Sequence, residues 1–220
     1  VGSLGTDSAG QTVLCYDRLE YLKIEASSKV PVTQQLVTQI KTLCDEEEVP
    51  HENIGFDDSG NQSVADAYEM FVGKPGVYRI NFAASAPDLA VSAVNSSLAS
   101  ERYKNRVTWL YYLVQELGQR GQLKGLPAKA VEQFCSRRLG AKQKPLTLEG
   151  KKEYKKRMNS GSPDEADACA ILAGVARERL GLMPGASELF PGGIAFPAAS
   201  STFTDMNFVR RMNNLGMHRG

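Results

Sequence analysis

Short apolar runs and helical apolar spacings follow one another along the first 182 residues of the chain. Residues 11–17 and 18–26 are rich in Val, Leu, Ile and Tyr, and apolar and polar positions nearly alternate in the second run. This pattern predicts two strands that pair as a hairpin. The glycine-containing residues before them carry a weaker signal for a first strand that ends near Asp7.

Helical and extended patterns then alternate. Residues 31–50 have the apolar spacing of an amphipathic helix that ends at a proline. A short buried-type strand over 53–56, a second helix over 63–71 and a further strand over 76–82 follow it. The order strand, helix, strand, helix, strand predicts a mixed α/β sheet.

The second half of the chain is predicted to be mainly helical. Helical patterns cover residues 101–121, 128–139 and 164–180, and the small, polar residues 88–100 are expected to form a loop. The basic stretch that begins at Lys142 is expected to be a loop or hairpin leading into the last helix.

Composition and length limit the possible classes of protein. The 220 residues predict one domain over 1–182 and an irregular tail over 183–220 that is rich in Gly, Pro, Ser and Ala. The net charge of +1 argues neither for nor against nucleic acid. The four cysteines form no CxxC pair, so neither a zinc site nor a disulfide framework is expected. There is no signal peptide and no apolar run near the roughly 18 residues of a membrane span. The chain starts at Val1 rather than Met, which is compatible with a fragment of a longer protein.

The stretch SGSPDEADA, residues 160–168, fits two interpretations. It is typical of a helix start, because Ser162 suits the N-cap, Pro163 the first helical position and Glu165 the third, which forms a capping box. It is also typical of one wall of a metal site, because Asp164 and Asp167 add two carboxylates within the first turn.

The spacing predicts that both aspartates point toward the interior. Asp164 stands four residues before Ala168 and seven before Ile171, which belong to the apolar stripe of the last helix. Asp167 stands four residues before Ile171, at the border of the same face. Carboxylates on an inward face need a cation or hydrogen-bond donors. Asp164 and Asp167 are therefore candidate ligands, whereas replacing Glu165 with Gln is expected to be mild.

Two more aspartates lie beside apolar strands and glycine turns. Asp57 ends the strand in IGFDDSG, and Asp7 lies in LGTDSAG just before a strand. Carboxylates at strand ends open onto the usual functional edge of an α/β sheet. Oxygen ligands of this kind suit Mg²⁺, and two such ions can activate water and stabilise the leaving oxygen in phosphodiester cleavage.

Four segments with these residues occur in order: GTDSAGQTVLCYD, IGFDDSGNQSVADAYEMF, RYKNRVTWLYYLVQELGQRGQLKGLP and KKRMNSGSPDEADACAILAG. Together they resemble the C-terminal nuclease domain of the large terminase subunit of tailed bacteriophages, over most of residues 1–182. The resemblance implies an RNase H-like fold, a mixed central β-sheet flanked by helices on both faces. It implies catalytic acids from the first strand, the fourth strand and the final helix at Asp7, Asp57 and Asp164, with Asp167 as an additional or alternative metal ligand.

The resemblance leaves one choice between neighbouring residues and makes one prediction. Asp58 is the rival of Asp57, which is preferred because it directly follows Phe56 and forms an Asp-x-x-Gly pattern with Gly60. Asp164→Asn is expected to abolish cutting without unfolding the domain.

The resemblance also implies a function. Members of that family use two Mg²⁺ or Mn²⁺ ions to cut concatemeric viral double-stranded DNA, with little sequence preference, during genome packaging in the cytoplasm of the infected bacterial host. The implied partners are double-stranded DNA, a packaging ATPase domain, the small terminase subunit and the portal, with no membrane. No G-x-x-x-x-G-K-[ST] loop occurs, so either the chain is an excised domain or the motor is on another chain. The alternatives are another RNase H-like nuclease, such as a Holliday-junction resolvase, and a non-catalytic DNA-docking module of a packaging complex.

Basic residues gather ahead of the last helix, where contacts with the DNA backbone are expected. The predicted DNA-binding residues are Lys142, Lys144, Lys151, Lys152, Lys155, Lys156 and Arg157. The aromatic residues Trp109, Tyr111 and Tyr112 are predicted to be core and rim of their helix rather than base-stacking groups.

Overall fold

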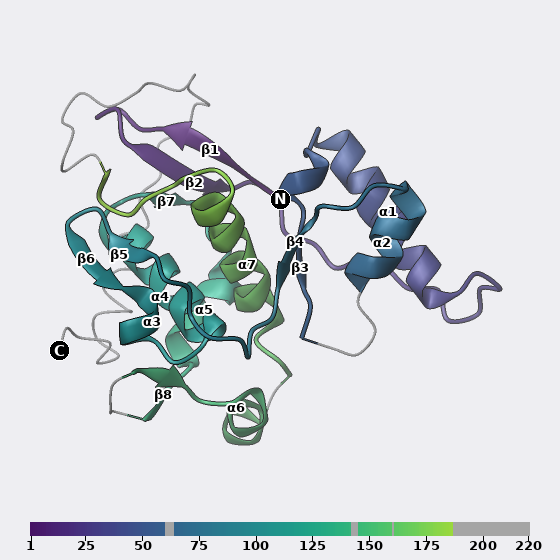
Figure 1. The fold of residues 1–220 in the computed structure, drawn as a ribbon. Coiled ribbons are helices and arrows are strands. Elements are labelled where there is room, and N and C mark those ends of the chain that lie inside the picture. The colour runs from purple at the N-terminus through teal and green to yellow at the C-terminus, as the bar shows by residue number, and fades with distance from the viewer. Residues whose placement is uncertain (60–63, 142–144, 160, 187–220) are drawn as a thin grey trace.

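A computed structural model describes residues 1–59, 64–141, 145–159 and 161–186. This part of the chain is a mixed α/β structure with seven α-helices, one 3-10 helix and nine short strands (Figure 1). The predicted α/β class is therefore confirmed. No helix within these ranges combines the length and the apolar character that a membrane crossing requires.

The strands form one three-stranded sheet and three separate pairs among the described residues. In the larger sheet β2 lies in the middle, antiparallel to β1 and parallel to β7. Strands β3 and β4 form a parallel pair, and the other two pairs are antiparallel. The strands are β1 Gly2–Thr6, β2 Thr12–Tyr16, β3 Gly55–Asp57, β4 Tyr78–Ile80, β5 Ala90–Ser92, β6 Asn95–Leu98, β7 Leu123–Lys124, β8 Leu139–Ala141 and β9 Thr147–Leu148. The described strands thus form several small sheets in place of the single central sheet that we expected.

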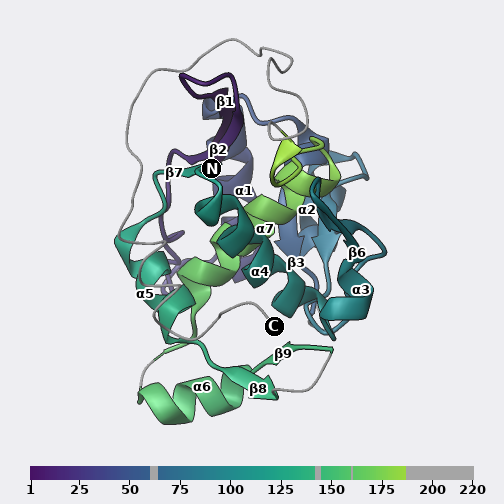
Figure 2. The same cartoon turned by 90° about the vertical axis from the view of Figure 1, so that its left-hand side faces the viewer.

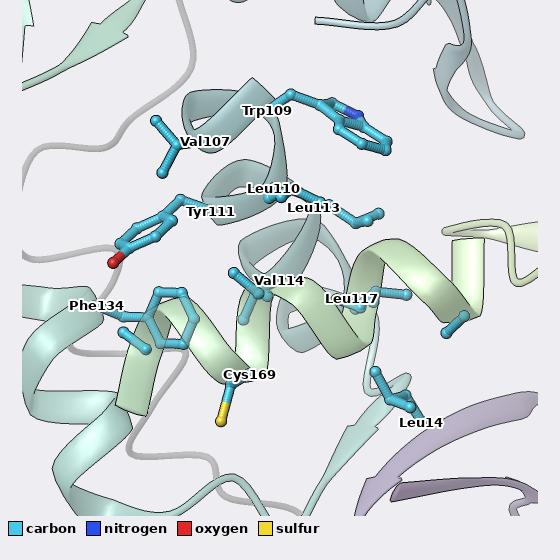
Figure 3. Close-up of a cluster of buried hydrophobic side chains, with 14 of the residues drawn as sticks. Leu14, Val107, Trp109, Leu110, Tyr111, Leu113, Val114, Leu117, Phe134 and Cys169 are labelled. Atoms are coloured by element: carbon cyan, nitrogen blue, oxygen red, sulfur yellow. The ribbon is translucent and has the colours of Figure 1, made fainter. Parts of the chain in front are cut away.

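The last helix, α7, lies near the middle of the fold, and α4 and α5 pack against it (Figures 1 and 2). They are α1 Val32–Glu46, α2 Val64–Val72, α3 Ala99–Arg102, α4 Arg106–Gln119, α5 Ala128–Ser136, α6 Lys151–Met158 and α7 Asp164–Glu178, and the 3-10 helix is His51–Asn53. Figure 3 shows α7 passing across α4, with the labelled core side chains between and around them.

Small residues allow α7 to pack closely on its neighbours. Ala166, Ala170 and Ala173 are fully buried. A Cβ added at Gly174 would lie 2.9 Å from Cδ2 of Leu110 on α4, so only glycine fits this contact without a shift of the neighbour. The main core forms where α7 meets α4, α5 and strands β2 and β4.

A second, smaller core lies where α1 and α2 cover strands β3 and β4. Its buried residues are Val37, Ile54, Phe56, Ala65, Tyr68 and Val77. The predicted helices and strands of this region are all present. Each element buries one face, and the spacing of its apolar residues marks that face in the sequence.

The predicted strand over 18–26 is wrong, and the hairpin is formed by β1 and β2 instead. Side chains of α1 pair with the main chain of this segment in place of a strand. Gln39 accepts from the backbone N–H of Lys23 and donates to its carbonyl oxygen, and Gln35 does the same for Glu25. The backbone groups are satisfied without a sheet, so the alternating pattern alone did not decide the structure.

Two further boundaries differ from expectation. The predicted loop over 88–100 contains the β5–β6 hairpin and the start of α3. The ordered fold also continues beyond residue 182, because Pro184 and Gly185 are buried and the backbone N–H of Gly185 donates to Oε1 of Gln122 at 2.7 Å. The rest of the predicted tail, residues 187–220, lies outside the described residues.

Candidate functional site

The first turn of α7 is held by a side chain from another helix rather than by its own N-cap. The helix begins at Asp164, Pro163 precedes it, and no side chain at that cap position accepts a hydrogen bond. Instead, Oε1 of Gln133 on α5 accepts from the backbone N–H of Ala166 at 2.9 Å. The predicted capping box is therefore wrong, because a distant amide satisfies the free N–H group of this turn.

Glu165 is a buried partner of several donors. Its carboxylate accepts from the hydroxyl of Tyr21 and the amide of Gln133, and it forms an ion pair with Lys129. Burial alone would raise the pKa of Glu165, but the hydrogen bonds from Lys129, Tyr21 and Gln133 outweigh it and lower the pKa to about 2. This cluster fastens the segment after β2 to α5 and α7, so Glu165 has a structural role that the sequence pattern did not reveal.

The two aspartates of the first turn lie in different environments. Asp167 is 5% exposed, whereas Asp164 and Ala168 are exposed. The prediction that Asp164 heads the buried face is therefore wrong. The buried side of α7 is centred on its small residues Ala166, Ala170 and Ala173, so the helix is rotated relative to the face that Ile171 would define.

The second strand-end acid, Asp57, lies beside the start of α7. It ends β3, and its Oδ1 accepts from the backbone N–H of Ser59 at 3.0 Å. Its Oδ2 lies 3.9 Å from Nζ of Lys151. The neighbouring Asp58 is instead 3.7 Å from a guanidinium nitrogen of Arg79. Asp57, rather than Asp58, is thus the carboxylate of this strand end that meets Lys151.

Lys151 lies between the two acids that the structure brings together. Its Nζ is 2.7 Å from Oδ2 of Asp167 and 3.9 Å from Oδ2 of Asp57. It is the first residue of α6, and Tyr154, one turn further on, is 3% exposed and lies 3.0 Å from the hydroxyl of Ser136. This anchored turn directs the lysine toward the acids, because positions three apart share a helix face.

The oxygens of Asp167 have unlike partners. Oδ1 accepts from the hydroxyl of Tyr111 at 2.8 Å and from Nη1 of Arg137 at 3.4 Å. Oδ2 lies 2.7 Å from Nζ of Lys151 and has no other polar partner among the described residues. Burial, and then the negative charge of Asp167, raise the pKa of Tyr111 well above its ordinary value, so the phenol stays a neutral donor. The second oxygen of this buried carboxylate thus faces a cationic group, the ammonium of Lys151.

Asp7 has its own partners in the β1–β2 turn. Its Oδ1 accepts from the backbone N–H groups of Ala9 and Gln11, both at 2.9 Å. A short polar side chain that bonds to the backbone two residues further on is common turn chemistry. This carboxylate therefore has a sufficient structural role in closing the hairpin.

The β1–β2 turn lies at the far end of α7 from the buried aspartate. At the end of β2, the hydroxyl of Tyr16 donates to the backbone oxygen of Cys169 near the start of α7. At the beginning of β2, the amide of Gln122 bridges the backbone oxygens of Thr12 and Met183, beyond the end of α7. From Cys169 to the end of α7 at Glu178 the helix rises roughly 14 Å, at about 1.5 Å per residue. In both views the turn is at the top of the molecule and α6 at the bottom (Figures 1 and 2).

The predicted metal set is therefore only partly assembled. Asp57 and Asp167 meet at Lys151, Asp164 lies at the exposed rim of the same helical turn, and Asp7 lies elsewhere. Within residues 1–59, 64–141, 145–159 and 161–186, no group of three His, Cys, Asp or Glu side chains lies close enough together to hold a metal ion.

The predicted DNA-binding residues divide into three groups. Lys152, Lys155 and Lys156 are exposed on α6. Lys151 faces the acids, and Arg157 forms an ion pair with Glu149. Lys142 and Lys144 lie outside the described residues. The exposed lysines of α6 thus form a basic surface next to the Asp57–Asp167 pair.

Sequence reasoning missed the residues that surround the pair. Tyr111 is a core residue, as predicted, but its hydroxyl also binds Asp167. Arg137 is 4% exposed and does not belong to a basic surface. A buried tyrosine or arginine needs a polar partner. This requirement is the one signal that could have linked Tyr111 and Arg137 to an acidic residue.

Comparison of the chain with protein-family models, with curated proteins and with solved structures found no match.

Proposed function

We propose that this chain is a metal-dependent endonuclease of RNase H-like type that hydrolyses phosphodiester bonds of double-stranded DNA. The observation that carries the proposal is the convergence of Asp57 and Asp167, from distant parts of the sequence, on one cationic group. The ammonium group of Lys151 occupies a position that two carboxylates favour for positive charge.

The donor set suits a hard divalent cation. Oδ2 of Asp167 is buried, and its polar partner among the described residues is the ammonium group of Lys151. Asp57 ends a strand, and its side chain is 36% exposed. Mg²⁺ is commonly held by one or two carboxylates, with water and substrate phosphate oxygens as its other ligands. Asp57 and Asp167 therefore suffice for one Mg²⁺ or Mn²⁺ ion. For the second ion that the resemblance implies, Asp164, three residues before Asp167 on α7, is a further candidate carboxylate.

Different residues of the chain would bind the metal ion and the DNA. A bound divalent ion would supply charge neutralisation at the scissile phosphate and activation of the attacking water. Asp57 and Asp167 would hold it, and Lys151 would have to move aside, because its nitrogen lies within ion-pair distance of both acids. The exposed lysines of α6 would bind the DNA backbone without reading its sequence, which suits a nuclease with little sequence preference.

Terminase function is the part of the proposal that rests on the sequence resemblance. Under it, the substrate is concatemeric viral DNA in the cytoplasm of an infected bacterium, and the partners are a packaging ATPase, a small terminase subunit and a portal.

Plasmid cleavage in the presence of Mg²⁺ or Mn²⁺ tests the proposal. We expect Asp57→Asn and Asp167→Asn each to abolish cutting, whereas the matched variant Asp58→Asn, at the neighbouring position, keeps it. Cutting by both Asp57→Asn and Asp167→Asn at the parent rate would refute the assignment. Preference for four-way junctions over linear DNA would identify a resolvase instead. Salt-dependent DNA binding without cleavage in any metal would identify a docking module.

A further inference from the structure

The two carboxylate oxygens of Asp167 have different partners. Tyr111 and Arg137 both donate to Oδ1, whereas Oδ2 pairs with Nζ of Lys151 at 2.7 Å and has no other polar partner among the described residues. A carboxylate with two free torsions would not keep its oxygens distinct unless its donors held it. The arrangement therefore determines which oxygen is offered to a cation.

Tyr111 is itself held rigidly. It is 2% exposed on α4, and its ring packs edge-on against Phe134 with ring centroids 4.7 Å apart (Figure 3). The hydroxyl can reach Asp167 only because α4 and α7 pack closely, through contacts such as that of Gly174 with Leu110. The donor position is thus a property of the core.

Arg137 is held by a backbone oxygen and an aromatic ring. Its Nε and Nη2 donate to the backbone oxygen of Glu149 at 3.3 and 3.1 Å, and its guanidinium carbon lies 4.9 Å from the centroid of the Tyr111 ring. Its remaining nitrogen, Nη1, contacts Asp167. The planar guanidinium joins the segment before α6 to the start of α7, which a flexible ammonium group would do less well.

We propose that Tyr111 and Arg137 are positioning residues of the metal site, which hold Oδ1 of Asp167 and thereby turn Oδ2 toward the cation that Asp57 also faces. The inference rests on the proposed function. It goes beyond that function because it assigns a role in metal affinity to two buried residues that do not touch the cation.

A purely structural role predicts something different. If the two residues only satisfied a buried carboxylate, their replacement would lower stability but leave metal affinity unchanged. If they position Asp167, metal affinity must fall as well, because partners of a ligand typically contribute about 10–100-fold to metal binding.

The chain offers a matched pair of tyrosines for the test. Tyr16 is buried like Tyr111, and its hydroxyl also donates to α7, to the backbone oxygen of Cys169 at 2.9 Å. Tyr16→Phe and Tyr111→Phe each remove one hydroxyl and one hydrogen bond to the same helix. Mn²⁺ alone is the probe, titrated into each full-length variant while electron paramagnetic resonance measures free Mn²⁺, and thermal unfolding without metal measures stability.

We expect both variants to lose similar stability, and only Tyr111→Phe to weaken Mn²⁺ binding, by about 10-fold or more. Mn²⁺ binding by Tyr111→Phe at the parent affinity overturns the inference. If Tyr111→Phe does not fold, Arg137→Lys gives the same test, because it keeps the charge but loses the guanidinium geometry. A folded Arg137→Lys variant with parent affinity also overturns the inference.

Asp167→Asn and Asp57→Asn separate this inference from the proposed function. If neither variant changes Mn²⁺ binding, the proposed metal site itself is wrong. If both weaken binding and Tyr111→Phe does not, the metal site stands and only the positioning role fails.

Discussion

Nζ of Lys151 lies 2.7 Å from Oδ2 of Asp167, the oxygen to which neither Tyr111 nor Arg137 donates. The same nitrogen is 3.9 Å from Asp57. Arg137 pairs with the other oxygen of Asp167, so Lys151 is the cation that lies between the two carboxylates. Lys151 and a divalent cation are thus expected to compete for this position.

Removal of the ammonium group should make this competition measurable. We expect Lys151→Met to tighten Mg²⁺ and Mn²⁺ binding by roughly fivefold, since an ion pair with a partly exposed lysine contributes about 1 kcal/mol. The variant should be less stable than the parent without metal, because Asp57 and Oδ2 of Asp167 then lose the ammonium group that they share. It should also gain more stability from added Mg²⁺. Isothermal titration calorimetry and thermal unfolding measure the two effects. Lys152→Met, at the exposed neighbouring position, is the control, and equal affinity in both variants would contradict the competition.

Asp7 is the residue at which the structure and the sequence resemblance differ most. Its Oδ1 accepts two backbone hydrogen bonds in the hairpin turn, and asparagine retains an oxygen at this place. We expect Asp7→Asn to cut plasmid DNA at nearly the parent rate and to change the unfolding free energy by less than about 0.5 kcal/mol. Asp7→Ala should be the less stable variant by about 1 kcal/mol, because the turn loses its acceptor. Loss of cutting in a stable Asp7→Asn variant would place this acid in the catalytic site.

The spacing of apolar residues correctly predicted the helices and strands that bury a single face. The helices α1, α2 and α5 and the strands β2 to β4 lie where apolar spacing placed them. The segment over 18–26 failed because glutamine amides of α1 pair with its backbone, a long-range interaction that no local pattern contains.

The candidate site was predictable only in part, for a related reason. Large apolar residues such as Ile171 indicated one face of α7, but Ala170, Ala173 and Gly174 form the buried face because they allow α4 to approach. A stripe of small residues carries little hydrophobic signal, so Asp164 was assigned to the interior, where Asp167 lies.

Glu165 gives a prediction about pH. Its pKa is about 2, below the ordinary value of 4.5, so its hydrogen bonds and ion pair stabilise the fold fully above about pH 4.5. We expect Glu165→Gln to lower the unfolding free energy by about 1–3 kcal/mol at pH 7, since hydrogen bonds to a charged group are lost. The difference from the parent should shrink as the pH falls from 4.5 toward 2, because the parent carboxylate becomes protonated. Urea unfolding at pH 7, 4 and 3 measures it, with the exposed Glu153→Gln as control. A difference that is constant with pH would show that the charge of Glu165 does not stabilise the fold.

The basic surface of α6 predicts a specific salt dependence of DNA binding. Lys152, Lys155 and Lys156 are exposed and form no ion pair with a described residue, so their charges are free for phosphates. Each phosphate contact contributes about 0.9 to the slope of log affinity against log salt. Replacing all three with Gln should therefore weaken binding to a short duplex and make the slope shallower by roughly 2–3. Fluorescence anisotropy without divalent metal measures this between low and moderate salt, and Lys23→Gln with Lys29→Gln, on the exposed segment after β2, is the control. Equal slopes for the α6 variant and the parent would remove this helix from the DNA-binding surface, whatever the outcome of the cleavage assays.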